Sequence, residues 1–471
     1  MASTFWKTAA LVAFAVSLFT NPVFATSPYS GPSFSSIEIN DIDSPLGNQI
    51  RDAGFTSPQR QMGAVVEDIC PPPLGFIGTA TPEREDLQVR CSEMVVAVLS
   101  GDPSRLKEAQ AGLQGVASEE SLGLGTLEVD GAGSQMNNIG ERILNVRGAA
   151  TTGLVRGGES GFHWSGGAAG DGDNKWGFFV SGLYASSDRD STDRESGFEA
   201  DDYGFTAGLD YTPNEKMLLG VAFGYKSSDA DIDANGGSLE SDSFSGFAYF
   251  SFFPDENWYV DVMFGHTSND HDQDRRLSWS IAGIGANAGS TTTINQSALS
   301  ETDSDEFSFS IAAGRNFLVG NWFLTPYARL DYANIDIDGY TESMSNPTAP
   351  GRGMALQIDS QEFDSLMTTF GARLSSQFQT SFGDVIPDIS VEYVHEFENE
   401  GDPLTGRFVN ESLGRTFTLL RDDPDENFFN IGAGVNAMFT DTATGFLRYQ
   451  ALVGYEDLSV HTVEFGVRIT F

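Results

Sequence analysis

The chain has 471 residues, and its 67 acidic residues outnumber its 26 basic residues to give a formal net charge of −41. That balance argues against nucleic acid or another polyanion as a partner, because such ligands require basic patches. The acidic residues gather between strand-like runs, at 188–202, 229–242 and 422–426 for example, which is the pattern of solvated loops.

The first residues predict a secretory signal peptide. Lys7 precedes an apolar stretch over 9–19, and small residues follow where a signal peptidase requires them, at Val23 and Ala25. The stretch is too short for a bilayer-spanning helix, which takes ~20 apolar residues. We therefore expect removal of residues 1–25 by cleavage between Ala25 and Thr26.

Residues 26–132 predict a short exported N-terminal region. The part over 26–80 is rich in Ser, Pro and Gly and predicts extended or loosely ordered chain. From about residue 82 the apolar spacing becomes helical, with one helix expected to start at Asp102-Pro103 and another at Ser118. The helical pattern continues to Arg147, and a glycine-rich linker follows.

The only two cysteines, Cys70 and Cys91, both lie in this N-terminal region. In an oxidising compartment two cysteines most simply form one disulfide, which closes a loop of roughly twenty residues and contributes on the order of 3 kcal/mol by restricting the unfolded chain. A redox or metal role would need a CxxC spacing or more ligands. We therefore predict a structural disulfide.

Residues 171–471 predict an all-β transmembrane domain, an antiparallel outer-membrane β-barrel of about 12 strands. The last nine residues alternate without exception between an apolar face that ends at Phe471 and a polar face that carries Glu464 and Arg468. Buried charges would be costly in a soluble core, whereas a transmembrane barrel turns apolar residues to lipid and polar ones to a wet lumen. The predicted strands lie near 175–187, 202–212, 216–228, 242–253, 257–267, 304–318, 321–334, 363–378, 385–397, 427–440, 444–456 and 459–471.

The connections between these strands alternate in length. Tight turns such as 213–216 alternate with long polar connections, and bacterial barrels place short turns on the periplasmic side. Trp176, Trp258 and Trp322 each begin a strand on that side, where an aromatic girdle lies at the interface. A soluble β-sandwich or propeller also alternates, but it does not need a signal peptide, alternating connection lengths and a terminal aromatic together. The long connections are 268–303, 335–362 and 398–425.

These features together resemble the type V autotransporters, whose C-terminal twelve-strand barrel is threaded by a helix that joins it to an exported passenger. The resemblance is carried by the segments 463–471, 324–330 and 137–147. It implies a pore helix and linker over 133–170 and an insertion signal at Phe471. It also implies an outer-membrane location in a Gram-negative bacterium, with lipid, lipopolysaccharide, the barrel insertion machinery and periplasmic chaperones as partners.

A helix inside the pore would bring its charged residues to the lumen wall. We expect Glu141, Arg142 and Arg147 to pair there in a partly dehydrated interior, where desolvation offsets much of the attraction. The alternative is an amphipathic helix beside the barrel in the periplasm. The expected partners on the wall are Asp210, Asp261, Asp331, Glu392 and Arg329.

The resemblance also implies a reaction at Asn137-Asn138. In some family members the side-chain amide of the first asparagine attacks its own carbonyl carbon, forms a succinimide and releases the passenger, with a lumenal carboxylate as the activating base. By resemblance Asn137 would be the nucleophile. Other relatives leave this helix intact, so cleavage and retention both stay open.

Other sequence patterns predict neither an enzyme nor a cofactor. The sequence has no GxSxG, HExxH or phosphate-loop motif, and its five histidines are scattered. A calcium-loop spacing over 231–242 lacks flanking helices, which favours a solvated hairpin over a metal site. The sequence thus predicts a translocator that exports or displays its own N-terminal region. Two alternatives remain: a plugged outer-membrane channel, and a surface adhesin that acts through its acidic loops.

Overall fold

The computed structural model of the chain describes residues 46, 49–50, 53–69, 81–125, 127, 136, 139–140, 143 and 175–471, apart from 215, 234–235, 256, 285–286, 399–401, 412–413, 423 and 441. The chain divides into the units Met1–Ile42 and Asp43–Phe471, and every described residue belongs to the second. The predicted signal cleavage site at Ala25 and Thr26 lies outside the described residues. None of the helices described is both long and apolar enough to cross a membrane.

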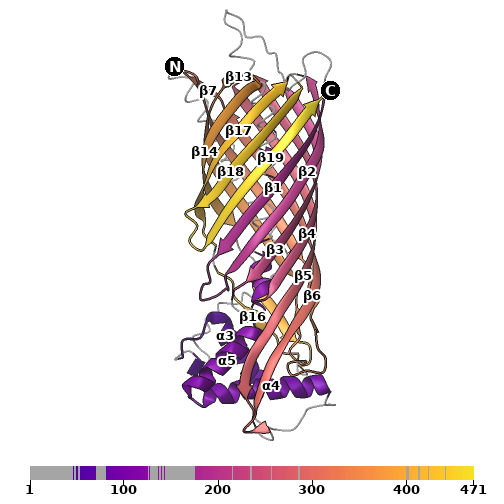
Figure 1. Cartoon of the computed structure of the whole chain (residues 1–471), viewed down its shortest axis with the longest axis vertical. Helices are drawn as coiled ribbons and strands as arrows, with labels where there is room; N and C mark the ends of the chain where they lie inside the picture. The colour runs from indigo at the N-terminus through magenta and orange to yellow at the C-terminus, as the bar shows by residue number, and fades with distance from the viewer. Residues whose placement is uncertain are drawn as a thin grey trace, which may run out of the picture. The chain divides into compact units, whose positions relative to one another are not determined.

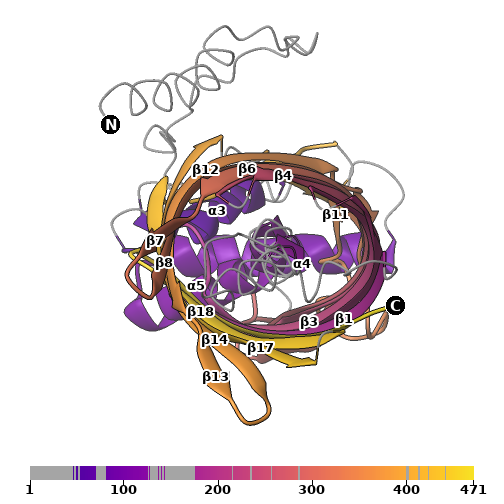
Figure 2. The same ribbon diagram turned by 90° about the horizontal axis from the view of Figure 1, so that it is seen from above.

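Twelve antiparallel strands close into a barrel (Figure 1), which confirms the predicted fold class. Each strand pairs with its neighbours in sequence, and β6 pairs directly with β8. The ring closes where the first and last strands pair from Gly177 with Thr470 to Arg189 with Leu458, as the end-on view of Figure 2 shows. The twelve are β1 (Trp176–Arg189), β2 (Phe198–Asn214), β3 (Met217–Ile232), β4 (Ser238–Asp255), β5 (Trp258–Ala282), β6 (Thr291–Arg315), β8 (Trp322–Ile337), β12 (Gln361–Ser376), β14 (Gly383–Glu398), β17 (Asn427–Thr440), β18 (Ala443–Val453) and β19 (Leu458–Thr470).

The outer face of the barrel carries an apolar band. Because side chains alternate along a strand, one face of each strand points out and the other points into the lumen. Phe178, Val221 and Phe264 are among the outward residues, and each is about half exposed. Trp176 and Trp322 stand at the end that has the tight turns, where a periplasmic aromatic girdle is expected. The opposite end is therefore the extracellular one.

Two strands run far past this apolar band at the extracellular end. We call residues 268–282 of β5 and 291–305 of β6 the β5–β6 extension; its first register pair is Ser268 with Asp305. The prediction of a long polar loop over 268–303 is wrong for the residues of these strands. The reason is that the alternation continues while the outward face becomes polar, so the extension lacks the apolar outer face on which the strand prediction relied.

Three helices lie at the extracellular end of the barrel (Figures 1 and 2): α3 (Ser57–Ile69), α4 (Pro82–Leu99) and α5 (Pro103–Val116). We call them the cap. The Asp102 side chain caps α5 by accepting from the backbone N–H of Ser104 at 2.8 Å, and Pro103 follows it, as predicted. The prediction of loosely ordered chain over 26–80 is wrong for Ser57–Ile69, where Met62, Val66 and Ile69 are buried at helical spacing.

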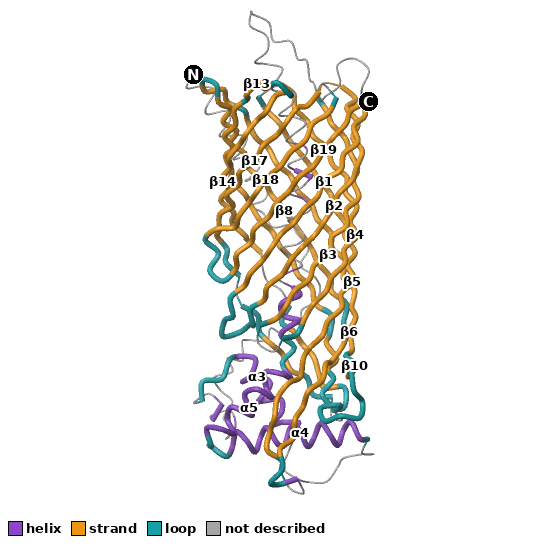
Figure 3. Tube along the Cα trace, in the orientation of Figure 1, coloured by secondary structure: helices purple, strands orange, loops and turns teal. Residues whose placement is uncertain are grey.

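Short strands in the long loops complete the extracellular part (Figure 3). Four of them form a small separate sheet in the order β16-β15-β11-β9, and β10 pairs with the β5–β6 extension at Ser343 and Leu299. The predicted loops 335–362 and 398–425 therefore carry structure that faces the cap. These strands are β9 (Tyr340–Thr341), β10 (Ser343–Met344), β11 (Leu356–Ile358), β15 (Leu404–Phe408) and β16 (Phe417–Leu419); β7 (Phe317–Val319) and β13 (Phe378–Thr380) flank the tight turns.

Candidate functional site: the lumen and its extracellular closure

One wall of the lumen is apolar and carries a helical segment. Met136, Ile139 and Ile143 are helical and buried, and their spacing of three and four places them on one helix face. They share a buried cluster with lumen-facing side chains of the early barrel strands. Those wall residues are Phe179, Leu218, Ala222, Phe247, Tyr249, Phe253, Tyr259 and Met263.

The later strands give the lumen an ionic wall. The Asp388 carboxylate on β14 accepts from Arg448 Nη1 on β18 at 2.9 Å and lies 3.6 Å from Arg373 Nε on β12. The intervening strand β17 has Gly432 at this point, and a Cβ there would lie 2.4 Å from Arg448 Nη2. The glycine therefore leaves room for arginine to reach across a strand to its carboxylate partner.

The same device occurs where the barrel closes. Arg468 on β19 lies across β1 and pairs with Asp210 on β2, with 2.6 Å between Nη2 and Oδ1 and both side chains buried. A Cβ on Gly177 of β1 would lie 2.5 Å from both groups. We call Arg468, Gly177 and Asp210 the seam clasp. The predicted insertion signal, Phe471, lies beside it and donates its backbone N–H to the carbonyl of Trp176 at 2.9 Å.

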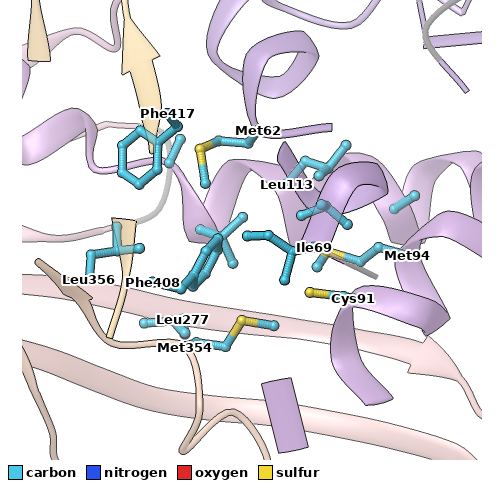
Figure 4. Packing of buried hydrophobic residues seen from close by; sticks show 14 of the residues in the cluster. Met62, Ile69, Cys91, Met94, Leu113, Leu277, Met354, Leu356, Phe408 and Phe417 are labelled. Atoms are coloured by element: carbon cyan, nitrogen blue, oxygen red, sulfur yellow. The ribbon is translucent and has the colours of Figure 1, made fainter. Parts of the chain in front are cut away.

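At the extracellular end, the cap and the barrel share one hydrophobic core (Figure 4). Met62, Met94 and Leu113 of the cap lie in the same buried cluster as Leu277 of the β5–β6 extension and Phe408 of β15. All are almost fully buried. A core of this kind is normally found inside a single domain, and here it joins the N-terminal helices to the end of the barrel.

A buried arginine ties three segments of this closure together. Arg275 donates to both carboxylate oxygens of Glu342, at 2.7 and 2.6 Å, and to the carbonyls of Gly115 on α5 and Met354. Burial alone would lower the pKa of Arg275, but the Glu342 carboxylate more than offsets this and raises it. The guanidinium therefore stays charged and its donors are used on both the barrel and the cap.

A buried carboxyl group lies where the chain leaves the cap for the barrel. Glu119 accepts from Gln114 Nε2 at 2.6 Å and also from the hydroxyl of Ser196. Burial raises its pKa to about 8, and the nearby carboxyl groups of Glu120 and Glu195 contribute in the same direction. Beside it, Arg421 donates to the backbone carbonyls of residues 121 and 122. The helical residues that begin at Glu119 are thus held by polar contacts to the barrel loops.

Several residues singled out in the sequence fall outside the described residues. They are Asn137, Asn138, Glu141, Arg142, Arg147 and Cys70. Cys91 is described, and its side chain is buried on α4. The disulfide with Cys70, the reaction at Asn137 and the ion pairs of the pore helix all stay predictions.

The lumenal carboxylates that were expected to face the pore helix are all described. Asp331 accepts from Arg329 Nε at 2.7 Å, Asp261 accepts from Ser251 Oγ at 2.6 Å, and Asp210 pairs with Arg468 in the seam clasp. Glu392 accepts from the Tyr327 hydroxyl. For Asp210 and Glu392, sequence reasoning missed the wall partners because they come from strands far apart in the sequence. Within the described part of the chain, no group of three or more His, Cys, Asp or Glu residues is placed to hold a metal ion.

Comparison with known proteins gives matches to one family and to several barrels. The family model described as "Autotransporter beta-domain" matches residues 178–450, more than half of the chain. The esterases EstA of Pseudomonas aeruginosa and Pseudomonas putida are each 32% identical over 114 residues, which is 24% of this chain. The chain thus spans only 16% of the length of these curated relatives.

Solved structures of similar fold include three autotransporter barrels. The translocator domain of NalP from Neisseria meningitidis has a TM-score of 0.49 and 15% identity, covering 73% of this chain and 98% of that one. The β domain of the Bordetella autotransporter BrkA has a TM-score of 0.43 and 17% identity, covering 63% and 100%. The transport unit of AIDA-I from Escherichia coli has a TM-score of 0.40 and 11% identity, covering 69% and 99%.

Proposed function

The chain belongs to the autotransporter β-domain family, and on that basis we propose that it exports its own short N-terminal region and displays it on the cell surface. Family membership places the barrel in the outer membrane of a Gram-negative bacterium. The proposed task is export and display, and the translocator domain itself is not catalytic. The esterase activity in the name of EstA is not carried over to this chain.

The observation that carries this proposal is the path of the chain. β1 begins at Trp176, at the periplasmic end of the barrel, whereas the cap lies at the extracellular end. Between them in sequence, Met136, Ile139 and Ile143 contact lumen-facing side chains. These positions of the described residues support a path of the chain through the barrel.

The charged and apolar walls of the lumen suit this path. The apolar wall supplies a contact surface for one helix face, and on the ionic wall Arg448 and Arg373 are paired with Asp388. Folding of the cap outside the cell then supplies free energy that favours the exported state.

The remaining steps rest on the family and on the sequence. We propose that a signal peptide over 1–25 brings the chain to the periplasm, that chaperones keep it unfolded there, and that the insertion machinery reads the strand ending at Phe471. Lipid and lipopolysaccharide then surround the apolar band. Cleavage at Asn137-Asn138 is a separate proposal, since it concerns only what happens to the chain after export.

The test is an epitope inserted near Gly31, followed by protease treatment of intact cells and immunoblotting. Export predicts a tag that the protease removes from intact cells while periplasmic markers survive. A tag that is reached only after the outer membrane is broken would overturn the proposal and favour a plugged channel. A fragment boundary at Asn137-Asn138 would add self-cleavage.

A further inference from the structure

The distal part of the β5–β6 extension has an apolar inner face that the barrel itself cannot cover. Leu277, Trp279 and Ile281 point to the inner side of the extension and are at most 5% exposed. They lie beyond the level at which the lumen wall is polar, and α5 packs against them. Without the cap this face would be open to water, and exposed apolar surface of that kind marks a binding surface.

From this we propose that the β5–β6 extension, with β9, β11, β15 and β16, is a folding template that captures the exported helices. The template would hold these helices at the cell surface by non-covalent contacts, even where the chain that joins them to the barrel is cut. The inference rests on the proposed export of the N-terminal region and goes beyond it. Strands that are not needed to span the membrane then serve to bind the cap, and the cap stays on the barrel after export.

The fit between template and cap is close enough to bring backbone against side chain. Trp279 lies against two glycines of α5: a Cβ on Gly115 would be 2.8 Å from the indole ring, and one on Gly112 would be 3.3 Å from Nε1. On the other side of the cap, a Cβ on Gly353 would lie 2.1 Å from the carbonyl oxygen of Glu83 on α4. Contacts this tight are made by surfaces shaped for each other.

Polar groups form hydrogen bonds across the contact between the cap and the rest of the extracellular part. The Asp86 carboxylate on α4 accepts from the buried backbone N–H groups of Gly351 and Gly353, at 2.8 and 3.1 Å. Arg275 of the template uses one of its donors on the carbonyl of Gly115. If the cap left, these hydrogen bonds would be exchanged for bonds to water, and the charged Asp86 carboxylate makes its own bonds stronger than those between neutral groups, which favours this occupant of the template.

Two consequences follow for export. The helices that emerge first meet a surface that completes their core, so capture outside the cell opposes backward sliding into the lumen. Breaking the chain near the cap also leaves its pieces bound. The predicted disulfide does not tether the cap to the barrel, because Cys70 and Cys91 both precede α5.

The experiment cuts the chain inside the cap. A protease recognition sequence is inserted after Gly101, in the exposed turn between α4 and α5, in the full-length chain with the epitope near Gly31. Intact cells are treated with the protease, and the tag is followed in the cell pellet and in the medium. The proposal predicts complete cutting with most of the tag still in the pellet. Release of the tag from this otherwise unchanged chain would overturn it.

Variants separate the template from contacts among the helices. The double change Leu277→Ser and Trp279→Ser is expected to release most of the tag after cutting, whereas Ser278→Ala and Ser280→Ala on the outward face of the same strand should not. The change Gly115→Leu on α5 should release it too, and this variant leaves every barrel residue unchanged. Retention in all of these variants would contradict the template.

A chain whose N-terminal region is not exported would give a different result in this experiment. If the N-terminal region is not exported, the protease does not cut in intact cells at all, and cutting appears only after the outer membrane is opened. Barrel folding is monitored in each variant by the shift in gel mobility on heating, so that a variant without a folded barrel is recognised and replaced by Gly115→Leu.

Discussion

The strand β5 passes through two environments, and the arrangement of its faces at the distal end is the opposite of that in the membrane-spanning part. In the membrane-spanning part, outward residues such as Val260 and Phe264 are apolar and the inward Asp261 is polar. In the extension, the outward Asp272 is charged and the inward Leu277 is apolar and fully buried. The period of two is the same in both.

This difference teaches that alternation identifies a strand but not its inner face. Lipid outside and water inside select one arrangement, whereas water outside and a helix inside select the other. The outward face changes from apolar to polar near the pair Ser268 and Asp305, and this change therefore marks the outer boundary of the apolar band.

The largest effect is expected on the cap side, from Glu342→Ala. This change leaves the charge of Arg275 buried without its carboxylate partner, and breaking a buried pair in this way typically costs about 3–5 kcal/mol. We expect amide hydrogen exchange of α5 to accelerate while that of the membrane-spanning strands stays the same. Glu301→Ala, on the exposed outer face of β6, is the control and should leave both unchanged.

On the membrane side, Val221→Arg should reduce the fraction of folded barrel. An arginine on the lipid face near the bilayer centre costs about 2–4 kcal/mol, and Val221 is 59% exposed on that face. Asp231→Arg on the same strand points outward above the band and should be tolerated. Gel mobility before and after heating measures the folded fraction. An equal loss of folded barrel in both variants would contradict the outer boundary of the apolar band given above.

The seam clasp gives a smaller effect inside the barrel wall. Gly177→Ala puts a Cβ 2.5 Å from Arg468 and Asp210, and overpacking of this kind costs about 1–3 kcal/mol. The same change at Gly246 meets no atom within 4 Å and serves as the control. Urea unfolding of the barrel in lipid vesicles compares the two. Equal urea midpoints for the two variants would mean that Arg468 and Asp210 can pair across β1 without the space that Gly177 leaves.

Counted per pH unit, the smallest effect is a pH dependence of the stability of the cap. Since the pKa of Glu119 is raised from 4.5 to about 8, its unfolded form loses a proton at lower pH than its folded form does. The stability of the closure should therefore fall as pH rises through that window, by at most about 1.4 kcal/mol per pH unit. Glu119→Gln should flatten this dependence. Protease resistance of the cap at several pH values measures it, and an unchanged slope in the variant would assign the effect to another group.

Much of the barrel could be predicted because its signals are local. The turn at 213–216, the tryptophans that begin strands and the alternation that ends at Phe471 are all visible within a few residues, as is the Asp102-Pro103 helix start. The extension was missed although Leu277, Trp279 and Ile281 alternate, because its outer face is polar. Helix α3 was missed because Gly63 and polar residues weaken a pattern that Met62, Val66 and Ile69 still carry.

The candidate site depended on distances that a sequence does not show. Arg468 and Asp210 are 258 positions apart, and only the register of β19, β1 and β2 brings them together. Arg275 meets Glu342 and Gly115 for the same kind of reason. Glycines such as Gly177 and Gly115 are common in strands and helices alike, so nothing local marks them as points of close approach.

The most direct test of the account is the location of the cap in living cells. A cysteine introduced by Ser104→Cys at the exposed start of α5 is treated with a maleimide that cannot cross the outer membrane, with the unsubstituted chain as the baseline. We predict labelling of intact cells at the same level as after the outer membrane is opened. Labelling that requires an opened membrane would place the cap in the periplasm and contradict export.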